Sequence, residues 1–232
     1  MKTYSIYLIR HGITDGNLEG KYIGRTDVPL SEMGKKELSD LAEKYNYPKA
    51  DAYFTSPLSR CIETLGILYP DATPISIPGF RECNFGRFEE RTADELADDP
   101  DFIRWMNEGG RFAPPEGEST MEFMQRTLVD FERVVEGMMK TGTQSAVIVA
   151  HSGTIMSILS AYGLPRASFY DWATAPGRGY CIRLHPRLWT SDKVFEVYDI
   201  LPFGEEENED TNLVAMGREA ANKAFSHSED EE

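Results

Sequence analysis

Two histidines stand where short hydrophobic runs end, and an imidazole in such a place can act as a nucleophile or carry a proton. Residues 5–10 lead into His11, and residues 145–150 lead into His151. Short, β-rich runs that are followed by a small residue are typical of buried parallel strands. Because open α/β sheets bind ligands outside the carboxyl ends of their strands, we expect both imidazoles at one reaction centre.

Charged residues near the predicted strand ends add what phosphoryl transfer needs. Arg10 directly precedes His11, and Arg60 falls in the first turn of a predicted helix. Helix N-termini attract anions, and guanidinium forks match phosphate oxygens. Glu82 lies in a predicted loop after a third strand and supplies a carboxyl group. Two guanidiniums, two imidazoles and one carboxyl are sufficient for phosphoryl transfer without a metal.

Zinc is the main alternative use of two histidines. The sequence contains neither an HExxH-type spacing nor a close pair of cysteines, so we expect no metal site and no cofactor. The three cysteines, Cys61, Cys83 and Cys181, are odd in number and widely spaced, and we expect them to be reduced packing residues.

The elements that would position these side chains alternate between strand and helix patterns. We expect strands over 4–10, 51–55, 73–77, 146–150, 179–184 and 194–200, and helices over 32–45, 57–68, 119–139 and 154–162. Proline 57 would occupy the favoured first position of its helix. This alternation predicts an α/β fold with three αβα layers and a mainly parallel, mixed sheet.

Two segments depart from this alternation. Residues 84–117 are rich in Gly, Pro, Trp and Phe and are expected to form short helices and loops, as a lid over one edge of the sheet. Residues 204–232 are acidic and are expected to form a tail that is partly helical or disordered. We therefore expect one catalytic domain, residues 1–203, followed by that tail.

Composition limits the partners of the chain. The 232 residues carry a formal net charge of −15, which argues against binding to a nucleic-acid backbone. No stretch approaches the ~20 apolar residues that span a bilayer, and the N-terminus has no signal-peptide pattern. We expect a cytoplasmic protein that binds neither nucleic acid nor membrane; the sequence does not indicate its oligomeric state.

Six ordered motifs resemble those of the histidine phosphatase superfamily, also called phosphoglycerate mutase-like. The resemblance extends from residue 4 to about residue 201. It is carried by Leu8-Ile9-Arg10-His11-Gly12 with Asn17, by residues 24–34 (GRTDVPLSEMG), by Ser56-Pro57-Leu58-Ser59-Arg60, by Arg81-Glu82 with Phe85-Gly86, by residues 114–119 (PPEGES), and by Ala150-His151-Ser152-Gly153. It implies a phosphoglycerate mutase-like fold and a metal-independent site.

The resemblance also implies a role for each residue. His11 would be the nucleophile and become a phosphohistidine, while Arg10, Arg60 and His151 would hold the phosphoryl oxygens. Glu82 would protonate the leaving oxygen and then accept a proton from water. Contacts to the phosphate or leaving group are further expected from Asn17, Gly24 and Ser152.

These roles impose protonation states. His11 attacks only when neutral, and we expect the neighbouring guanidiniums to oppose its protonation. Glu82 must instead carry a proton when the leaving group departs, and an apolar wall formed by Phe85 or Phe88 is expected to favour that form.

The pattern is most similar to the α-ribazole phosphatase and broad-specificity phosphatase branch. We therefore expect a phosphatase of small-molecule phosphomonoesters. A phosphoglycerate mutase is the alternative within enzymes, although the segment between Glu82 and Ser119 is short and poor in basic residues. A non-catalytic sensor of a phosphorylated ligand is the alternative of another class. Ser152, Ile13-Thr14 and Glu90 depart from residues common in the family and weaken any inference about the substrate.

Overall fold

One mixed sheet of seven strands organises residues 2–205, the part of the chain that this computed structural model describes. The strand order is β3-β2-β4-β1-β6-β7-β5. All neighbouring pairs are parallel except β1–β6 and β6–β7, which are antiparallel. The strands are β1 (Tyr4–Arg10), β2 (Ala52–Thr55), β3 (Ile75–Ser76), β4 (Ser145–Ala150), β5 (Gly163–Leu164), β6 (Gly179–Leu184) and β7 (Phe195–Leu201).

The central strands β1 and β4 are buried on both faces, which explains their continuous hydrophobic sequence. Successive side chains of a strand point to opposite faces. Ile6 and Leu8 of β1 join the core on one face, whereas Ile9 joins the core on the other. In β4, Ile148 and Val149 divide in the same way.

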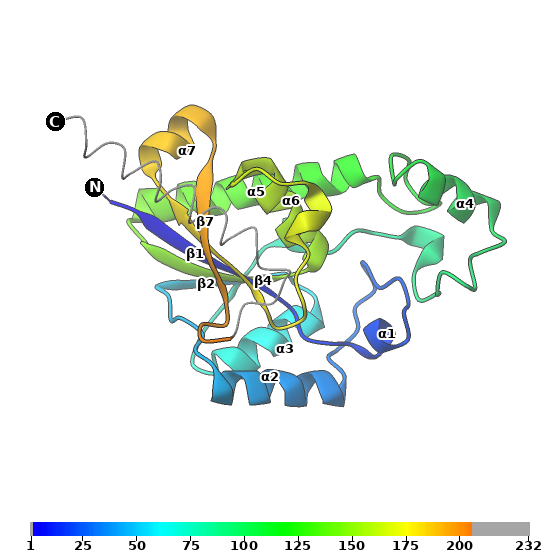
Figure 1. Ribbon diagram of the computed structural model, residues 1–232, viewed down its shortest axis with the longest axis horizontal. Coiled ribbons are helices and arrows are strands. Elements are labelled where there is room, and N and C mark those ends of the chain that lie inside the picture. Colours follow the sequence, from blue (N-terminus) through cyan, green and yellow to red (C-terminus); the bar gives the residue numbers. More distant parts are fainter. Residues whose placement is uncertain (1, 206–232) are drawn as a thin grey trace.

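Helices cover both faces of the sheet (Figure 1). Helices α5 (Thr120–Thr141) and α6 (Ser152–Tyr162) supply the core of one face, and α2 (Glu32–Lys44) and α3 (Ser59–Leu68) supply the core of the other. The predicted α/β fold, with three layers and a mainly parallel sheet, is confirmed.

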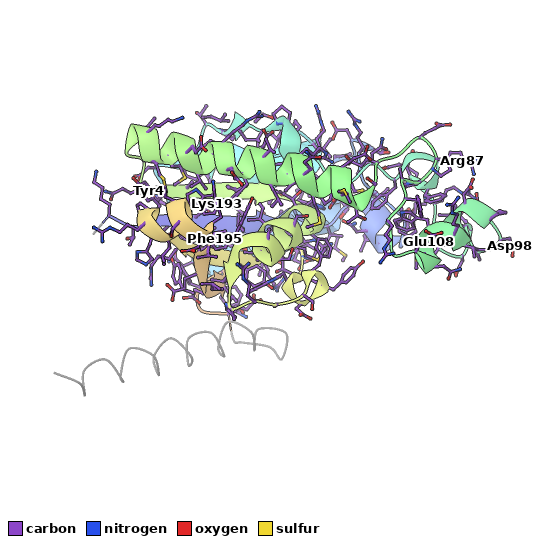
Figure 2. All side chains as sticks on the ribbon, turned by 90° about the horizontal axis from the view of Figure 1, so that it is seen from above. Tyr4, Arg87, Asp98, Glu108, Lys193 and Phe195 are labelled. Carbon is purple, nitrogen blue, oxygen red and sulfur yellow. The ribbon has the colours of Figure 1, made fainter. Side chains whose placement is uncertain are left out.

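Residues 84–117 project at the end of the molecule toward which β1 runs (Figure 1). They contain η2 (Gly86–Phe88) and α4 (Pro100–Asn107), with a small core of their own formed by Phe88, Leu96 and Phe102. Figure 2 shows Arg87, Asp98 and Glu108 at this end and Tyr4, Lys193 and Phe195 toward the opposite end. The segment therefore lies beyond the carboxyl ends of the parallel strands.

Several predicted boundaries need correction. Helix α3 begins at Ser59 with Leu58 as its N-cap residue, so Pro57 lies outside it and not at its first position. The side chain of Asp27 accepts hydrogen bonds from the backbone N–H (2.7 Å) and the hydroxyl (3.0 Å) of Ser59, and thereby caps this start. The predicted third strand is reduced to Ile75–Ser76, an exposed edge.

Several short elements were not predicted from the sequence. They are α1 (Asp15–Leu18), the 3-10 helices η1 (Pro78–Phe80) and η3 (Phe169–Trp172), strand β5 and α7 (Pro186–Asp192). Each has too few residues to show a hydrophobic period.

No helix within residues 2–205 is long and apolar enough to cross a membrane. Most of the predicted acidic tail, residues 206–232, lies outside the described residues. The boundary between domain and tail stays a prediction.

Candidate active site

The register of the sheet brings His11 and His151 together. Strands β1 and β4 pair in parallel with Arg10 opposite Ala150, and the backbone N–H of His11 donates to the carbonyl of Ala150 at 2.9 Å. The two imidazole rings, which follow these paired positions, meet edge to face with centroids 5.1 Å apart. Both side chains are buried, at 5% and 0% exposure. The predicted meeting of the two histidines at one strand edge is confirmed.

His11 is held in a form suited to nucleophilic attack. Its Nδ1 lies 2.6 Å from the carbonyl oxygen of Gly12, so in the neutral ring Nδ1–H donates there and Nε2 keeps its unshared pair. Burial, followed by Arg60, lowers the pKa of His11 to about 3; the hydrogen bond to the Gly12 carbonyl opposes this effect, and Arg10 adds a smaller lowering. The guanidiniums act in the predicted direction, but burial is the larger cause.

His151 is also kept neutral. Burial, followed by His11 and Arg60, holds its pKa well below the ordinary value. Its Nε2 lies 2.8 Å from the hydroxyl of Ser56 and 3.6 Å from the sulfur of Cys61. Burial raises the pKa of the Cys61 thiol, so this cysteine packs as a neutral group, as predicted.

The two arginines present unpaired donors. Arg60, at 1% exposure in the first turn of α3, donates through Nη1 to the Thr26 carbonyl (2.9 Å) and through Nη2 to the Gly24 carbonyl (2.6 Å). Arg10 donates through Nη1 to the carbonyl of Thr174 at 2.5 Å. The Nε of each arginine is buried without a hydrogen-bond partner among residues 2–205. Since a buried unpaired donor costs about 1–3 kcal/mol, these N–H groups are suited to receive an anion.

Glu82 lies at the N-terminus of α6. Its carboxylate accepts hydrogen bonds from the backbone N–H groups of Cys83 (2.8 Å) and Gly153 (3.4 Å). These bonds and the guanidiniums of Arg60 and Arg10 favour the charged form, but burial outweighs them and raises the pKa of Glu82 above its ordinary value. The carboxyl can therefore hold a proton at a higher pH than an exposed glutamate.

Five predicted residues thus share one site, because the charges of Arg10 and Arg60 act on both His11 and Glu82, and His11 meets His151. The three other predicted residues are placed differently. Asn17 is exposed in α1, where its side chain accepts from the backbone of Thr14 at 3.1 Å. Gly24 contributes its carbonyl to Arg60, and Ser152 begins α6 directly after His151. Contacts of these three residues with a substrate stay a prediction.

Phe88, one of the two rings expected beside Glu82, lies elsewhere. Phe88 is fully buried in the separate cluster with Leu96 and Phe102. The ring of Phe123 instead approaches Gly153, which donates to the Glu82 carboxylate; a Cβ built on Gly153 would lie 3.1 Å from this ring.

Two side chains that hold backbone atoms near the site were missed from the sequence. Arg126 of α5 donates to the carbonyl oxygens of Gly79 (2.8 Å), Arg81 (2.7 Å) and Glu82 (2.9 Å), and it also pairs with Glu118. Glu89 accepts four backbone N–H groups, including that of Gly24. Glu118, the partner of Arg126, lies in one of the family-like motifs, and Glu89 lies beside another. The spacing of residues along the chain does not reveal which backbone groups these side chains bind.

No cluster of three or more His, Cys, Asp or Glu side chains within residues 2–205 is arranged to hold a metal ion. A pocket of about 310 Å³, lined in part by Tyr47, Tyr53 and Tyr69, contains none of the candidate site residues. The arrangement around His11 is therefore the candidate centre for chemistry.

Comparison with known proteins finds relatives of two kinds and solved structures of similar fold. The chain is 27% identical over 191 residues to the adenosylcobalamin/alpha-ribazole phosphatase of Escherichia coli K12, covering 80% of this chain and 92% of that protein. It is 31% identical over 162 residues to a 2,3-bisphosphoglycerate-dependent phosphoglycerate mutase of Gloeobacter violaceus, covering 66% and 73%. The crystal structure of the alpha-ribazole phosphatase from Shigella flexneri superposes with a TM-score of 0.71 at 24% identity, over 83% of this chain and 94% of that one, and shows the same fold.

The family profile described as histidine phosphatase superfamily (branch 1) matches residues 6–196, which include the five residues that share the site. The chain belongs to branch 1 of the histidine phosphatase superfamily.

Proposed function

We propose that the protein is a metal-independent phosphatase that hydrolyses a small-molecule phosphomonoester through a phosphohistidine on His11. The observation that carries this proposal is the meeting of the buried His11 and His151 rings beside Arg10 and Arg60, whose Nε–H groups have no partner among residues 2–205. Burial also lowers the pKa of His11 and raises the pKa of Glu82. A neutral imidazole can attack phosphorus, and a carboxyl group with a raised pKa is suited to protonate the leaving oxygen.

In the first step, Nε2 of His11 attacks phosphorus. A P–N bond forms as the P–O bond to the leaving group breaks, and Glu82 gives its proton to the departing oxygen. The unpaired Nε–H groups of Arg10 and Arg60 would bind the phosphoryl oxygens, with His151 beside them. Such donors stabilise the charge on the transferring group.

In the second step, a water molecule attacks the phosphorus of the phosphohistidine. Glu82, now a carboxylate, takes a proton from that water as the P–N bond breaks. Inorganic phosphate leaves, His11 regains its neutral ring, and Glu82 is ready to act again as an acid.

The proposal favours a phosphatase over a mutase. Relatives bear both names at similar identity. The segment between Glu82 and α5 is short, and the guanidinium of Arg87 within it pairs with Asp99 and Asp101. A mutase would need basic groups free to retain a phosphorylated product between the two steps.

The test is hydrolysis of p-nitrophenyl phosphate in the presence of EDTA. In parallel, the protein is incubated with ³²P-labelled p-nitrophenyl phosphate and recovered without exposure to acid, so that a phosphohistidine can be detected. We expect turnover and label in the wild type and in His185→Ala, and neither in His11→Ala. Loss of activity in EDTA would contradict a metal-independent reaction, and the absence of turnover and label would favour a sensor. A requirement for a bisphosphorylated primer would favour the mutase.

A further inference from the structure

The carboxylate of Glu89 accepts hydrogen bonds from four backbone N–H groups. They belong to two segments that lie far from each other in the sequence. One oxygen accepts from Arg25 (2.9 Å) and Phe85 (2.9 Å). The other accepts from Gly24 (3.0 Å) and Thr26 (3.2 Å). Glu89 ends η2 in the projecting segment 84–117, so the carboxylate fastens the loop of residues 24–26 to that segment.

The opposite polar edge of the same loop faces Arg60. The guanidinium donates to the carbonyl oxygens of Gly24 and Thr26, the two residues whose N–H groups share one oxygen of Glu89. Three backbone N–H groups of the loop therefore bind a carboxylate, and two of its carbonyls bind a guanidinium. The loop is therefore hydrogen-bonded to both charged side chains.

Close packing leaves this loop little freedom. A Cβ built on Gly24 would lie 1.8 Å from the carbonyl oxygen of Cys83 and 2.6 Å from Glu89. On its other side, the loop continues into Asp27, which caps α3 one residue before Arg60. The loop is thus fixed between the projecting segment and the helix that carries Arg60.

We propose that Glu89 is a positioning residue that acts through loop 24–26 to set the plane of the Arg60 guanidinium. The inference rests on the proposed function, since it assumes that Arg60 binds the phosphoryl group. The two Nη bonds to the loop fix the orientation of the fork, and the buried Nε–H stays unpaired. A fixed fork loses less conformational freedom when it binds a phosphate.

Glu89→Gln is the appropriate substitution. It preserves size, but each oxygen of Glu89 accepts two N–H groups, so either orientation of the amide places its NH₂ against two donors. Glu90→Gln is the matched control, because it removes the same charge from the neighbouring exposed side chain.

An effect of the negative charge alone and a positioning role predict opposite changes in phosphate binding for Glu89→Gln. Removal of a negative charge near the site strengthens the binding of an anion if the charge alone matters. If Glu89 positions Arg60, Glu89→Gln weakens the binding of inorganic phosphate about tenfold and lowers kcat/KM for p-nitrophenyl phosphate by about 10²-fold. Glu90→Gln is expected to stay within about twofold of the wild type in both measurements.

A double-mutant cycle with Arg60→Lys tests whether Glu89 acts through Arg60. We expect Glu89→Gln to cost less than about threefold in the Arg60→Lys background, because the group it positions is already gone. Equal losses in both backgrounds, unchanged phosphate binding or tighter phosphate binding would each overturn the proposal.

A spectroscopic measurement covers the case in which Glu89→Gln folds poorly. The ¹⁵Nε–¹Hε resonance of Arg60, assigned by its loss in Arg60→Lys, should be sharp in the wild type and broadened in Glu89→Asp, whose shorter arm cannot reach all four donors. A sharp, unshifted resonance in Glu89→Asp would overturn the proposal. Phosphate binding and this resonance do not depend on turnover, so an inactive wild type would contradict the proposed function and leave the role of Glu89 testable.

Discussion

The ring of His151 meets the edge of the His11 ring at a centroid distance of 5.1 Å, because both residues follow paired positions on β1 and β4. Burial lowers the pKa of both rings, and His11 lowers the pKa of His151 further. The site is thus prepared to hold two neutral imidazoles among positive guanidiniums. In the proposed reaction, a bound phosphoryl group would supply a negative charge to the guanidiniums.

The pH dependence of kcat/KM should follow from these shifts. His11 must be neutral and its pKa is about 3, so activity should fall only in strong acid. Glu82 must be protonated, and its pKa is raised, so activity should decline with rising pH at a value above that of an ordinary glutamate. We expect a bell-shaped profile whose alkaline limb lies above the pKa of an ordinary glutamate.

The substrate itself also titrates, since a phosphate monoester has a second pKa of about 6. Glu82→Gln provides the control, because it removes the contribution of the carboxyl and leaves that of the substrate. An unchanged decline at high pH in Glu82→Gln would mean that Glu82 does not set it.

Glu82→Gln should also discriminate between leaving groups. An alkoxide leaves poorly without a proton, so kcat/KM, which reports on phosphoryl transfer to His11 and not on the later attack of water, should fall by about 10²–10⁴-fold for an alkyl phosphate. A nitrophenolate needs no proton, and its loss should be much smaller. Steady-state rates on both substrates with one enzyme preparation measure the difference, and equal losses would count against Glu82 as the acid.

The sequence was sufficient to predict that His11 and His151 would meet. Buried parallel strands have a strong local signal, and their carboxyl ends lie at one edge of the sheet. His11 and His151 follow such strands, so their proximity could be inferred before any coordinates were known. The mixed α/β architecture followed from the same alternation of patterns.

The supporting contacts could not be predicted in this way. Glu89 binds a loop more than sixty residues away, and Arg126 holds the backbone of residues 79–82 from another helix. Such hydrogen bonds go to backbone atoms, which have no sequence signature. The prediction that Pro57 begins α3 was wrong for a related reason. The cap of α3 comes from Asp27, which is distant in the sequence, and not from the adjacent chain.

Acid should destabilise the protein partly through His11. Its pKa is about 3 in the folded state and about 6.5 in the unfolded state, so the unfolded state binds the proton first as the pH falls. The contribution to stability is complete above pH ~6.5 and declines by about 1.4 kcal/mol per pH unit below it. Urea unfolding of the wild type and His11→Gln should give a constant difference in the free energy of unfolding above pH 7. That difference should shift in favour of His11→Gln between pH 6 and pH 4, and a constant difference across both ranges would contradict the neutral state of His11.

Gly153→Ala should impair catalysis by moving Glu82. A Cβ at residue 153 would lie 2.6 Å from a carboxylate oxygen of Glu82 and 3.1 Å from the ring of Phe123, so the carboxyl must shift. Since a displacement of about 1 Å can cost about 10²-fold, we expect kcat/KM to fall by that order for alkyl phosphates and by less for p-nitrophenyl phosphate. The control is Gly66→Ala in α3, where a Cβ has open space, and where alanine should stabilise the helix by about 0.5–1 kcal/mol. Kinetics on both esters, with the thermal midpoint of each variant, separate the two effects. If Gly153→Ala lost activity equally on both esters, its methyl group would be acting on the phosphoryl site and not on the proton donor.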